Sequence, residues 1–223
     1  MSLDQIERYI EILKPHYRKR DSIHIMGGEP TLHPQIIDII KLLSNGFTKK
    51  PLIFLRSNGR SQFTKDVIKK IEDLKNNGIN ITVFSTKEKS ENVEEHFPIF
   101  QSIMDFPDAI EKYKLVEPYN FAIDKCWVPR ECGIGITPFG IFLCTRAVYI
   151  AHLLHLDVGE RRFLPFDELM KKQGDIFCKY CYRQVRELHS NLDLEKSKND
   201  PEITATWQKI LDNYDPNYSL TLF

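Results

Sequence analysis

The sequence predicts an α/β fold of parallel strands, followed by a small cysteine-rich module of the α+β type. Two observations carry this prediction. Helical and strand patterns alternate with short turns over residues 1–90 or so, which implies parallel strands joined by right-handed crossovers. All five cysteines lie in the second half of the 223-residue chain. No strand is predicted before the first helix, so the alternation looks incomplete at its start.

Three amphipathic helices are predicted in the first half, each from apolar residues at helical spacing and from terminal signals. A proline or a glycine marks the expected end of each helix, because neither residue continues one readily. The predicted helices run from a Ser2–Gln5 capping box to Pro15, from Pro34 to Gly46, and from a Thr64 cap to Gly78.

Three short β-rich runs, at residues 22–27, 52–58 and 79–86, are predicted as strands. A glycine or a small polar residue follows the apolar part of each run. The carboxyl ends of parallel strands meet at one edge of a sheet, where ligands gather. The three ends therefore predict one ligand-binding edge, formed by Gly27 to Pro30, Ser57-Asn58-Gly59 and Ser85-Thr86.

Beyond residue 90 the periodicity is lost, and shorter elements are predicted. Residues 133–144 read as a hairpin that turns at Pro138-Phe139-Gly140, and "FDELMKKQ" reads as a short helix before Cys178. A last helix is expected at residues 203–211. The predicted divisions are residues 1–118 for the α/β part, 119–190 for the cysteine-rich module and 191–223 for a polar tail with a helix.

The charge balance excludes two classes of partner. The chain has 31 lysines and arginines and 31 aspartates and glutamates, so no net field favours nucleic acid or an acidic membrane surface. No run reaches the roughly 18 apolar residues of a membrane span. The first residues lack the pattern of a signal peptide. We therefore expect a cytoplasmic protein, in which cysteines more often bind metal or act in redox chemistry than form disulfides.

Four of the cysteines have a spacing suited to one metal site. Cys178 and Cys181 are separated by two residues, and Cys126 lies 18 positions before Cys144, across the predicted hairpin. Four thiolates suit a tetrahedral zinc ion or an iron–sulfur cluster, and spacing does not separate the two. Inert or redox thiols are the alternative. By the same spacing, Cys132 is the spare cysteine.

Two stretches resemble known motifs of the radical SAM enzymes. Met26-Gly-Gly-Glu-Pro30 resembles their GGEP motif, and Ser57-Asn58-Gly59 resembles the Thr/Ser-Asn-Gly that follows the next strand. The cysteine-rich stretch is similar to their auxiliary cluster module, called SPASM or, in its one-cluster form, twitch. The resemblance implies a partial (β/α) barrel that binds S-adenosylmethionine, with a [4Fe–4S] cluster that releases a 5′-deoxyadenosyl radical to abstract hydrogen from the substrate.

The resemblance also assigns roles to residues. Gly27, Gly28 and Glu29 would face the amino group of S-adenosylmethionine, an ammonium that needs acceptors. The full set of expected cofactor-binding residues is Gly27, Gly28, Glu29, Pro30, Ser57, Asn58 and Ser85. The expected ligands of an auxiliary [4Fe–4S] cluster, with zinc as the alternative metal, are Cys126, Cys144, Cys178 and Cys181. The implied partners are a peptide or small-molecule substrate and a flavodoxin- or ferredoxin-type reductase.

The family's C-x-x-x-C-x-x-C loop is missing, because no cysteine precedes Cys126. We expect the chain to be a fragment that lacks the first strand and this loop; natural loss of the loop is the alternative. The first functional hypothesis is a radical SAM oxidoreductase whose chain, as given, lacks the cysteines for cleaving S-adenosylmethionine. The second is a non-catalytic metal-binding protein derived from that fold.

Three further side chains are weaker candidates. His33 follows the glycine turn and is expected to be a structural donor more often than a ligand. Arg146, two residues past Cys144, could bond a cluster sulfide or a substrate carboxylate. His152, with the nearby His155, is expected to be at least half-buried.

Overall fold

The protein is described by a computed structural model in which the chain forms two compact units, Met1–Phe100 and Gln101–Phe223. We call them the N-terminal and C-terminal units. The predicted divisions after residues 118 and 190 fall outside the described residues. The residues that the structure describes are 1–27, 29–57, 62–85, 95–96, 126, 128–129, 133–178, 212–215 and 220–222.

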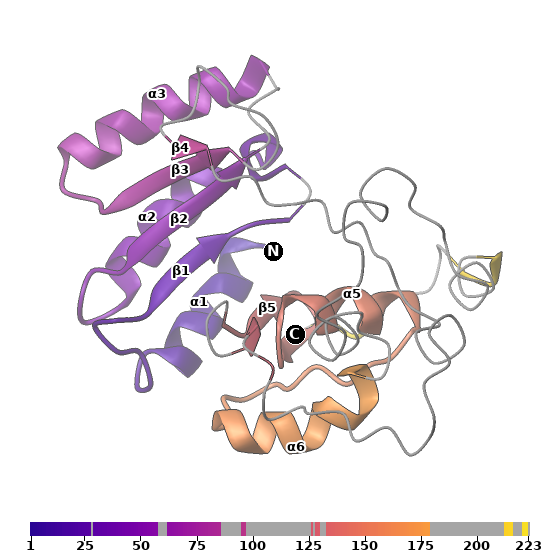
Figure 1. Cartoon of the computed structure of the whole chain (residues 1–223). Helices are drawn as coiled ribbons and strands as arrows, with labels where there is room; N and C mark the ends of the chain where they lie inside the picture. Colours follow the sequence, from indigo (N-terminus) through magenta and orange to yellow (C-terminus); the bar gives the residue numbers. More distant parts are fainter. Residues whose placement is uncertain are drawn as a thin grey trace, which may run out of the picture. The chain divides into compact units, whose positions relative to one another are not determined.

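The N-terminal unit alternates helices and strands along the chain (Figure 1). Its elements are α1 (Leu3–Leu13), β1 (Ser22–Ile25), the 3-10 turn η1 (Pro30–Leu32), α2 (Ile36–Gly46), β2 (Leu52–Ser57), α3 (Gln62–Asn76), β3 (Ile81–Ser85) and β4 (Glu95–His96). The strands form one sheet in the order β1-β2-β3-β4, and every pair is parallel. The predicted parallel α/β arrangement is therefore confirmed, with β4 as an added short strand.

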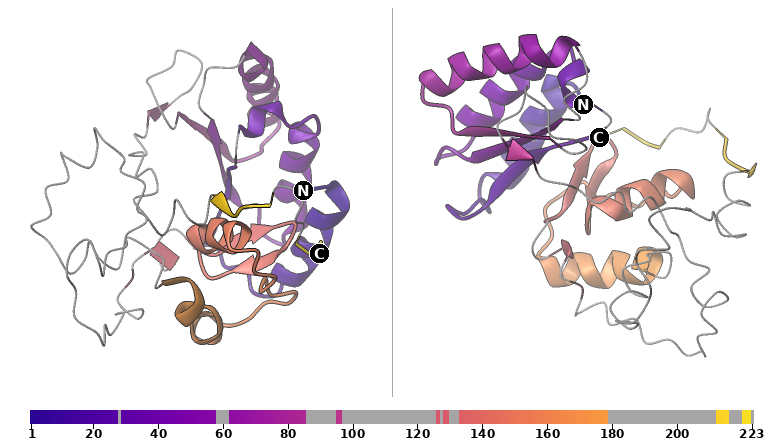
Figure 2. Two further views of the ribbon diagram at one scale, coloured as in Figure 1. Left: turned by 90° about the vertical axis from the view of Figure 1, so that its right-hand side faces the viewer. Right: turned by 45° about the horizontal axis from the view of Figure 1, so that its top comes forward.

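Alternate residues of each strand point to opposite sides of the sheet. Helices cover one of these two faces. Ile53 and Leu55 of β2 are fully buried, and Ile81 and Val83 of β3 are 1% exposed. These side chains pack with apolar residues of α2 and α3 in one core cluster. In Figure 2 (right) the helices of this unit gather on one side of its sheet. The opposite side carries no helix of the described part of this unit, and we call it the open face (Figure 2).

The helix starts were predicted with mixed success. The Ser2–Gln5 capping box is present, with Gln5 N donating to Ser2 Oγ at 3.2 Å and Ser2 N donating to Gln5 Oε1 at 3.0 Å. Helix α2 begins at Ile36 rather than Pro34, because η1 takes up the chain after the glycine turn. Thr64 is not a cap. Helix α3 begins at Gln62, and the Thr64 hydroxyl bonds a residue of η1 instead.

The C-terminal unit contains the predicted hairpin. Strands β5 (Gly135–Thr137) and β6 (Gly140–Phe142) pair antiparallel, and helices α5 (Thr145–Leu153) and α6 (Phe166–Phe177) follow. Helix α6 is longer than predicted, and α5 was not predicted. A close backbone approach fixes the turn: Gly140 has φ +128, and a Cβ there would lie 2.7 Å from Gly159 Cα. The last predicted helix, at residues 203–211, lies outside the described residues.

Candidate functional site

The glycine turn after β1 begins with backbone that few side chains allow. Gly27 has φ +154, which glycine adopts without steric cost. Glu29 then caps the 3-10 turn η1 in an extended conformation, and Pro30 takes its first position. Gly28 lies outside the described residues. The turn therefore carries Glu29 from the end of β1 to the edge of the sheet.

The carboxylate of Glu29 collects three donors on one oxygen. Glu29 Oε1 accepts hydrogen bonds from Thr31 N at 3.1 Å, Thr31 Oγ1 at 2.6 Å and Ser57 Oγ at 2.8 Å. Ser57 is the last residue of β2 and is 1% exposed. Bonds to a carboxylate are stronger than neutral ones. The glycine turn is therefore fixed to the carboxyl end of the neighbouring strand.

A second bond links this network to α3. Thr31 Oγ1 and Thr64 Oγ1 are 3.0 Å apart, and the two residues are 3% and 0% exposed. Because the single hydroxyl proton of Thr31 is given to Glu29, Thr64 must be the donor in this pair. The network thus joins the ends of β1 and β2 to the first turn of α3.

The structure brings several predicted cofactor-binding residues to one edge. Ser57 and Ser85 are register partners at the carboxyl ends of β2 and β3, so both strand ends lie at the same edge as the Glu29 turn. The predicted single edge therefore exists for these residues. Asn58, with Gly28, lies outside the description. His33 is a structural acceptor here, because its Nδ1 accepts from Gln35 N at 3.2 Å.

Three of the predicted metal ligands line one pocket of the C-terminal unit. Cys126, Cys144 and Cys178 surround it together with Arg146 and an apolar wall. Cys126 is buried. Cys144 directly precedes α5, and Cys178 directly follows α6. Cys181, the fourth predicted ligand, lies outside the described residues, as does Cys132. Three thiols that are distant in sequence therefore line the same pocket, and their role as metal ligands stays a prediction.

Gln173 of α6, which the sequence did not single out, bonds the backbone beside one of these cysteines. Its Oε1 accepts from Leu143 N at 2.7 Å, directly before Cys144. Its Nε2 donates to Ile141 O at 3.2 Å and Val158 O at 3.0 Å. The side chain is 1% exposed, so these bonds are made without competing water. Gln173 therefore ties the strand before Cys144 to the helix that ends at Cys178.

The pocket fits a metal in donor type but is narrow. Thiolates are ligands of zinc and of iron–sulfur clusters. Among the described side chains, no three of His, Cys, Asp or Glu are arranged to hold one ion as they stand. The cavity is about 20 Å³, room for about one water-sized atom.

Comparison with protein families gives the relationship. The family model of the radical SAM superfamily matches residues 1–115, just over half of the 223-residue chain. The chain belongs to the radical SAM superfamily. No curated protein and no solved structure matches the chain in the parallel comparisons. Membership implies, in general terms, chemistry that depends on S-adenosylmethionine and a [4Fe–4S] cluster.

The superfamily match covers the Glu29 network, in which Thr31 and Thr64 were not singled out as site residues. Thr31 follows Glu29 by two positions, and Thr64 was interpreted only as a helix cap. The signal available was two small hydroxylated residues near a strand-end carboxylate, which does not specify contact across 33 positions.

Among the described residues, no helix is long and apolar enough to cross a bilayer.

Proposed function

We propose that this radical SAM protein acts as an oxidoreductase that modifies a peptide or small-molecule substrate by hydrogen abstraction. The observation that carries the proposal is the Glu29–Ser57 bond at the carboxyl edge of the matched unit. It supports S-adenosylmethionine binding by Gly27, Gly28, Glu29, Pro30, Ser57, Asn58 and Ser85. When bound, the cofactor and its reduced cluster supply the radical that such chemistry needs.

The carboxylate would act in two ways at this edge. Oε1 holds the turn through Thr31 and Ser57, so the backbone around Gly27 is oriented before a ligand arrives. A preorganised acceptor binds an incoming ammonium with higher affinity than one that must be ordered on binding. The amino group of S-adenosylmethionine would then meet the strand-end carbonyls and the negative charge of Glu29.

Residues 1–125 do not fit a radical-generating cluster. They contain no cysteine, and the cluster's iron needs thiolates close to the bound cofactor. We therefore derive no cleavage step from these 223 residues. The activity proposed above would need thiolates from outside residues 1–125, and a flavodoxin- or ferredoxin-type protein is the proposed electron donor.

For the C-terminal unit we propose an auxiliary [4Fe–4S] cluster held by Cys126, Cys144, Cys178 and Cys181, as in a SPASM or twitch module. Three of these thiols already line one pocket. The second candidate is structural zinc in a non-catalytic metal-binding protein, and the cavity of about 20 Å³ favours it, because one ion needs less room than a cluster. The family match to residues 1–115 favours iron and sulfide.

Metal analysis after anaerobic purification separates the two candidates. The first predicts iron with acid-labile sulfide and a brown absorbance, and the second predicts stoichiometric zinc with none. Serine substitution of Cys126, Cys144, Cys178 or Cys181 should remove the metal under either candidate. The matched control is Cys132→Ser, which should keep it. Metal loss in Cys132→Ser but not in Cys126→Ser would overturn the ligand assignment.

A further inference from the structure

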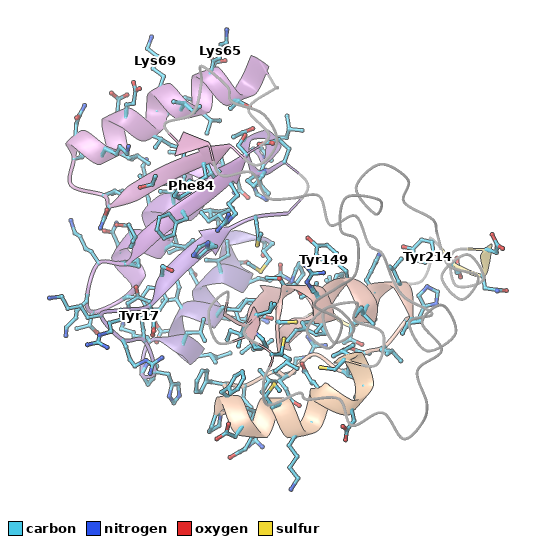
Figure 3. All side chains as sticks on the ribbon, viewed as in Figure 1. Tyr17, Lys65, Lys69, Phe84, Tyr149 and Tyr214 are labelled. Atoms are coloured by element: carbon cyan, nitrogen blue, oxygen red, sulfur yellow. The ribbon has the colours of Figure 1, made fainter. Side chains whose placement is uncertain are left out.

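The two chain segments that lead into β1 and β2 lie side by side before the strands begin. Ser22 and Leu52, the first residues of the two strands, are register partners. Tyr17 and Phe47, each five positions earlier, have ring centres 4.5 Å apart, and both pack in the core cluster with α1. Residues 17–22 therefore lie beside residues 47–52 at the amino edge of the sheet, where Figure 3 labels Tyr17.

Four cationic side chains lie between these two points of contact. Lys19 and Lys49 each precede the register pair by three positions, and Arg20 and Lys50 precede it by two. All four residues are exposed. We call them the basic patch. The two segments are about 30 positions apart in the chain, so the patch forms only in the folded unit.

The patch keeps its positive charge in the folded protein. The one carboxylate of the two segments is Asp21, which accepts from Arg18 N at 2.8 Å and from Arg18 Nη2 at 3.3 Å. Lys50 Nζ donates to a neutral acceptor, the carbonyl of Gly78, at 3.2 Å. Within the described residues, the other three members of the patch make no hydrogen bond or ion pair. Like charges held side by side repel, so an anionic ligand would relieve this repulsion.

The composition of the patch favours a short run of carboxylates over a nucleic acid. Tyr17 and Phe47 are the aromatic residues of the two segments, and their rings are packed in the core cluster. The Tyr17 hydroxyl also donates to Asp21 O at 2.6 Å, so neither ring is offered to a base for stacking. The whole chain is neutral, so a long polyanion would meet acidic surface beyond the patch, outside a screening length of about 8 Å.

We propose that the basic patch binds an acidic segment of a partner protein, a short run of aspartates or glutamates. The inference goes beyond the proposed function, because the patch lies at the opposite edge of the sheet from the Glu29 network. Strand β2, which joins the two edges, has six residues and spans about 20 Å. A partner held at the amino edge therefore leaves the carboxyl edge open to its own ligand.

The test uses a fluorescein-labelled peptide of about eight glutamates as the probe and a glutamine peptide of equal length as its uncharged counterpart. Fluorescence anisotropy with the 223-residue protein measures both. The glutamate peptide should bind saturably, at least about tenfold more tightly than the glutamine peptide, and more weakly as salt is added. Equal binding of the two peptides, or no saturable binding of the glutamate peptide, overturns the proposal.

Two charge-matched variants locate the binding surface. The patch variant combines Lys19→Gln, Arg20→Gln and Lys49→Gln, and it should lose at least about tenfold in affinity. The control removes the same charge from exposed positions of α3, two of them labelled in Figure 3, by Lys65→Gln, Lys69→Gln and Lys70→Gln. The control should bind as the wild type does. Circular dichroism checks that both are folded, and equal weakening in both would show a diffuse charge effect and overturn the assignment.

A charge-retaining variant and two other anions complete the test. Lys19→Arg combined with Lys49→Arg keeps the charge and should keep the affinity. A thymidine oligonucleotide of the same charge and phosphatidylserine vesicles represent nucleic acid and membrane. Tighter binding of the oligonucleotide, or co-sedimentation with the vesicles at the salt concentration used for the peptide, overturns the choice of a protein partner. Binding of S-adenosylmethionine is measured separately and should be unchanged in the patch variant, so this inference and the proposed function fail by different results.

Discussion

Ser57 Oγ donates a 2.8 Å hydrogen bond to Glu29 Oε1, joining residues 28 positions apart at the carboxyl ends of β2 and β1. Because the same oxygen also accepts twice from Thr31, it leaves little freedom to the glycine turn. The carboxylate has a structural task in addition to the ligand role proposed for it. Substitutions at Glu29 should therefore change stability as well as binding.

Removing the Glu29 carboxylate should destabilise the protein. Glu29→Ala leaves the hydroxyls of Ser57 and Thr31 without this acceptor, at a cost of about 2–3 kcal/mol in the free energy of unfolding. Glu29→Gln keeps an acceptor oxygen and should cost about 1 kcal/mol. Urea denaturation followed by circular dichroism measures both. The control Glu7→Ala, at an exposed position of α1, should stay within about 0.5 kcal/mol of the wild type.

The Thr31–Thr64 contact can be tested by two substitutions that differ in the hydroxyl. Thr64→Val removes the donor to Thr31 Oγ1 in a fully buried position and should cost about 1 kcal/mol of unfolding free energy. Thr64→Ser keeps the hydroxyl and should retain the hydrogen bond, at the cost of a small void. If Thr64→Val is as stable as the wild type while Thr64→Ser is not, the methyl group matters and the hydrogen bond does not.

Gln173 should control both the stability and the metal content of the C-terminal unit. Gln173→Met fills a similar volume but removes the bonds to Leu143 N and to the carbonyls of Ile141 and Val158. The expected loss is about 1–3 kcal/mol of unfolding free energy, with weaker retention of metal under a chelator. Lys171→Met, exposed on the same helix, is the control. Unchanged metal retention in Gln173→Met would contradict a positioning role.

Acid should weaken the open face through His24. Desolvation by neighbouring side chains, followed by the charge of Arg56, lowers the pKa of His24 below its usual value. The unfolded chain therefore takes up a proton first, near about pH 6.5. The stability due to neutral His24 is fully present above that pH and is lost as pH falls through the folded pKa.

The His24 contribution is isolated by difference, because other groups titrate in the same range. Unfolding midpoints of the wild type and His24→Gln, measured at about pH 5 and about pH 7.5, should converge at the lower pH. A gap between wild type and His24→Gln that widens in acid would show that protonation of His24 stabilises the fold, contrary to the expectation.

Sequence patterns predicted the elements that are stabilised by contacts between residues close in the chain. The Ser2–Gln5 capping box and the hairpin at Gly140 follow from patterns within a few residues, and the parallel strands follow from the alternation of helices and strands. Thr64 was misassigned because a threonine before an apolar run has the pattern of a cap, whereas its actual partner is Thr31, distant in sequence. Helix α5 was missed because Val148 and Ile150 are β-branched and Tyr149 is aromatic, a local composition that disfavours helix.

The placement of several candidate residues, though not their roles, could be predicted from residue types at strand ends and from cysteine spacing. Glu29 meets Ser57 as the parallel order requires, and Cys126, Cys144 and Cys178 reach one pocket. The sequence pattern did not predict the hydrogen bonds around these residues. Gln173 is a polar residue in an amphipathic helix, and nothing local distinguishes it from a solvated side chain. The hydrogen bond from Arg56 to His24 likewise depends on strand register, which cannot be read from the sequence.

Binding of S-adenosylmethionine to the 223-residue protein is the decisive test of the ligand role proposed for Glu29. Saturation-transfer NMR detects even weak binding, and we expect transfer to the cofactor's methionyl protons. The transfer should fall strongly in Glu29→Gln, checked to be folded, and stay unchanged in Glu7→Ala, because only Glu29 lies at the carboxyl edge beside Ser57. No transfer to the cofactor with the wild type, or equal transfer with Glu29→Gln, would contradict it.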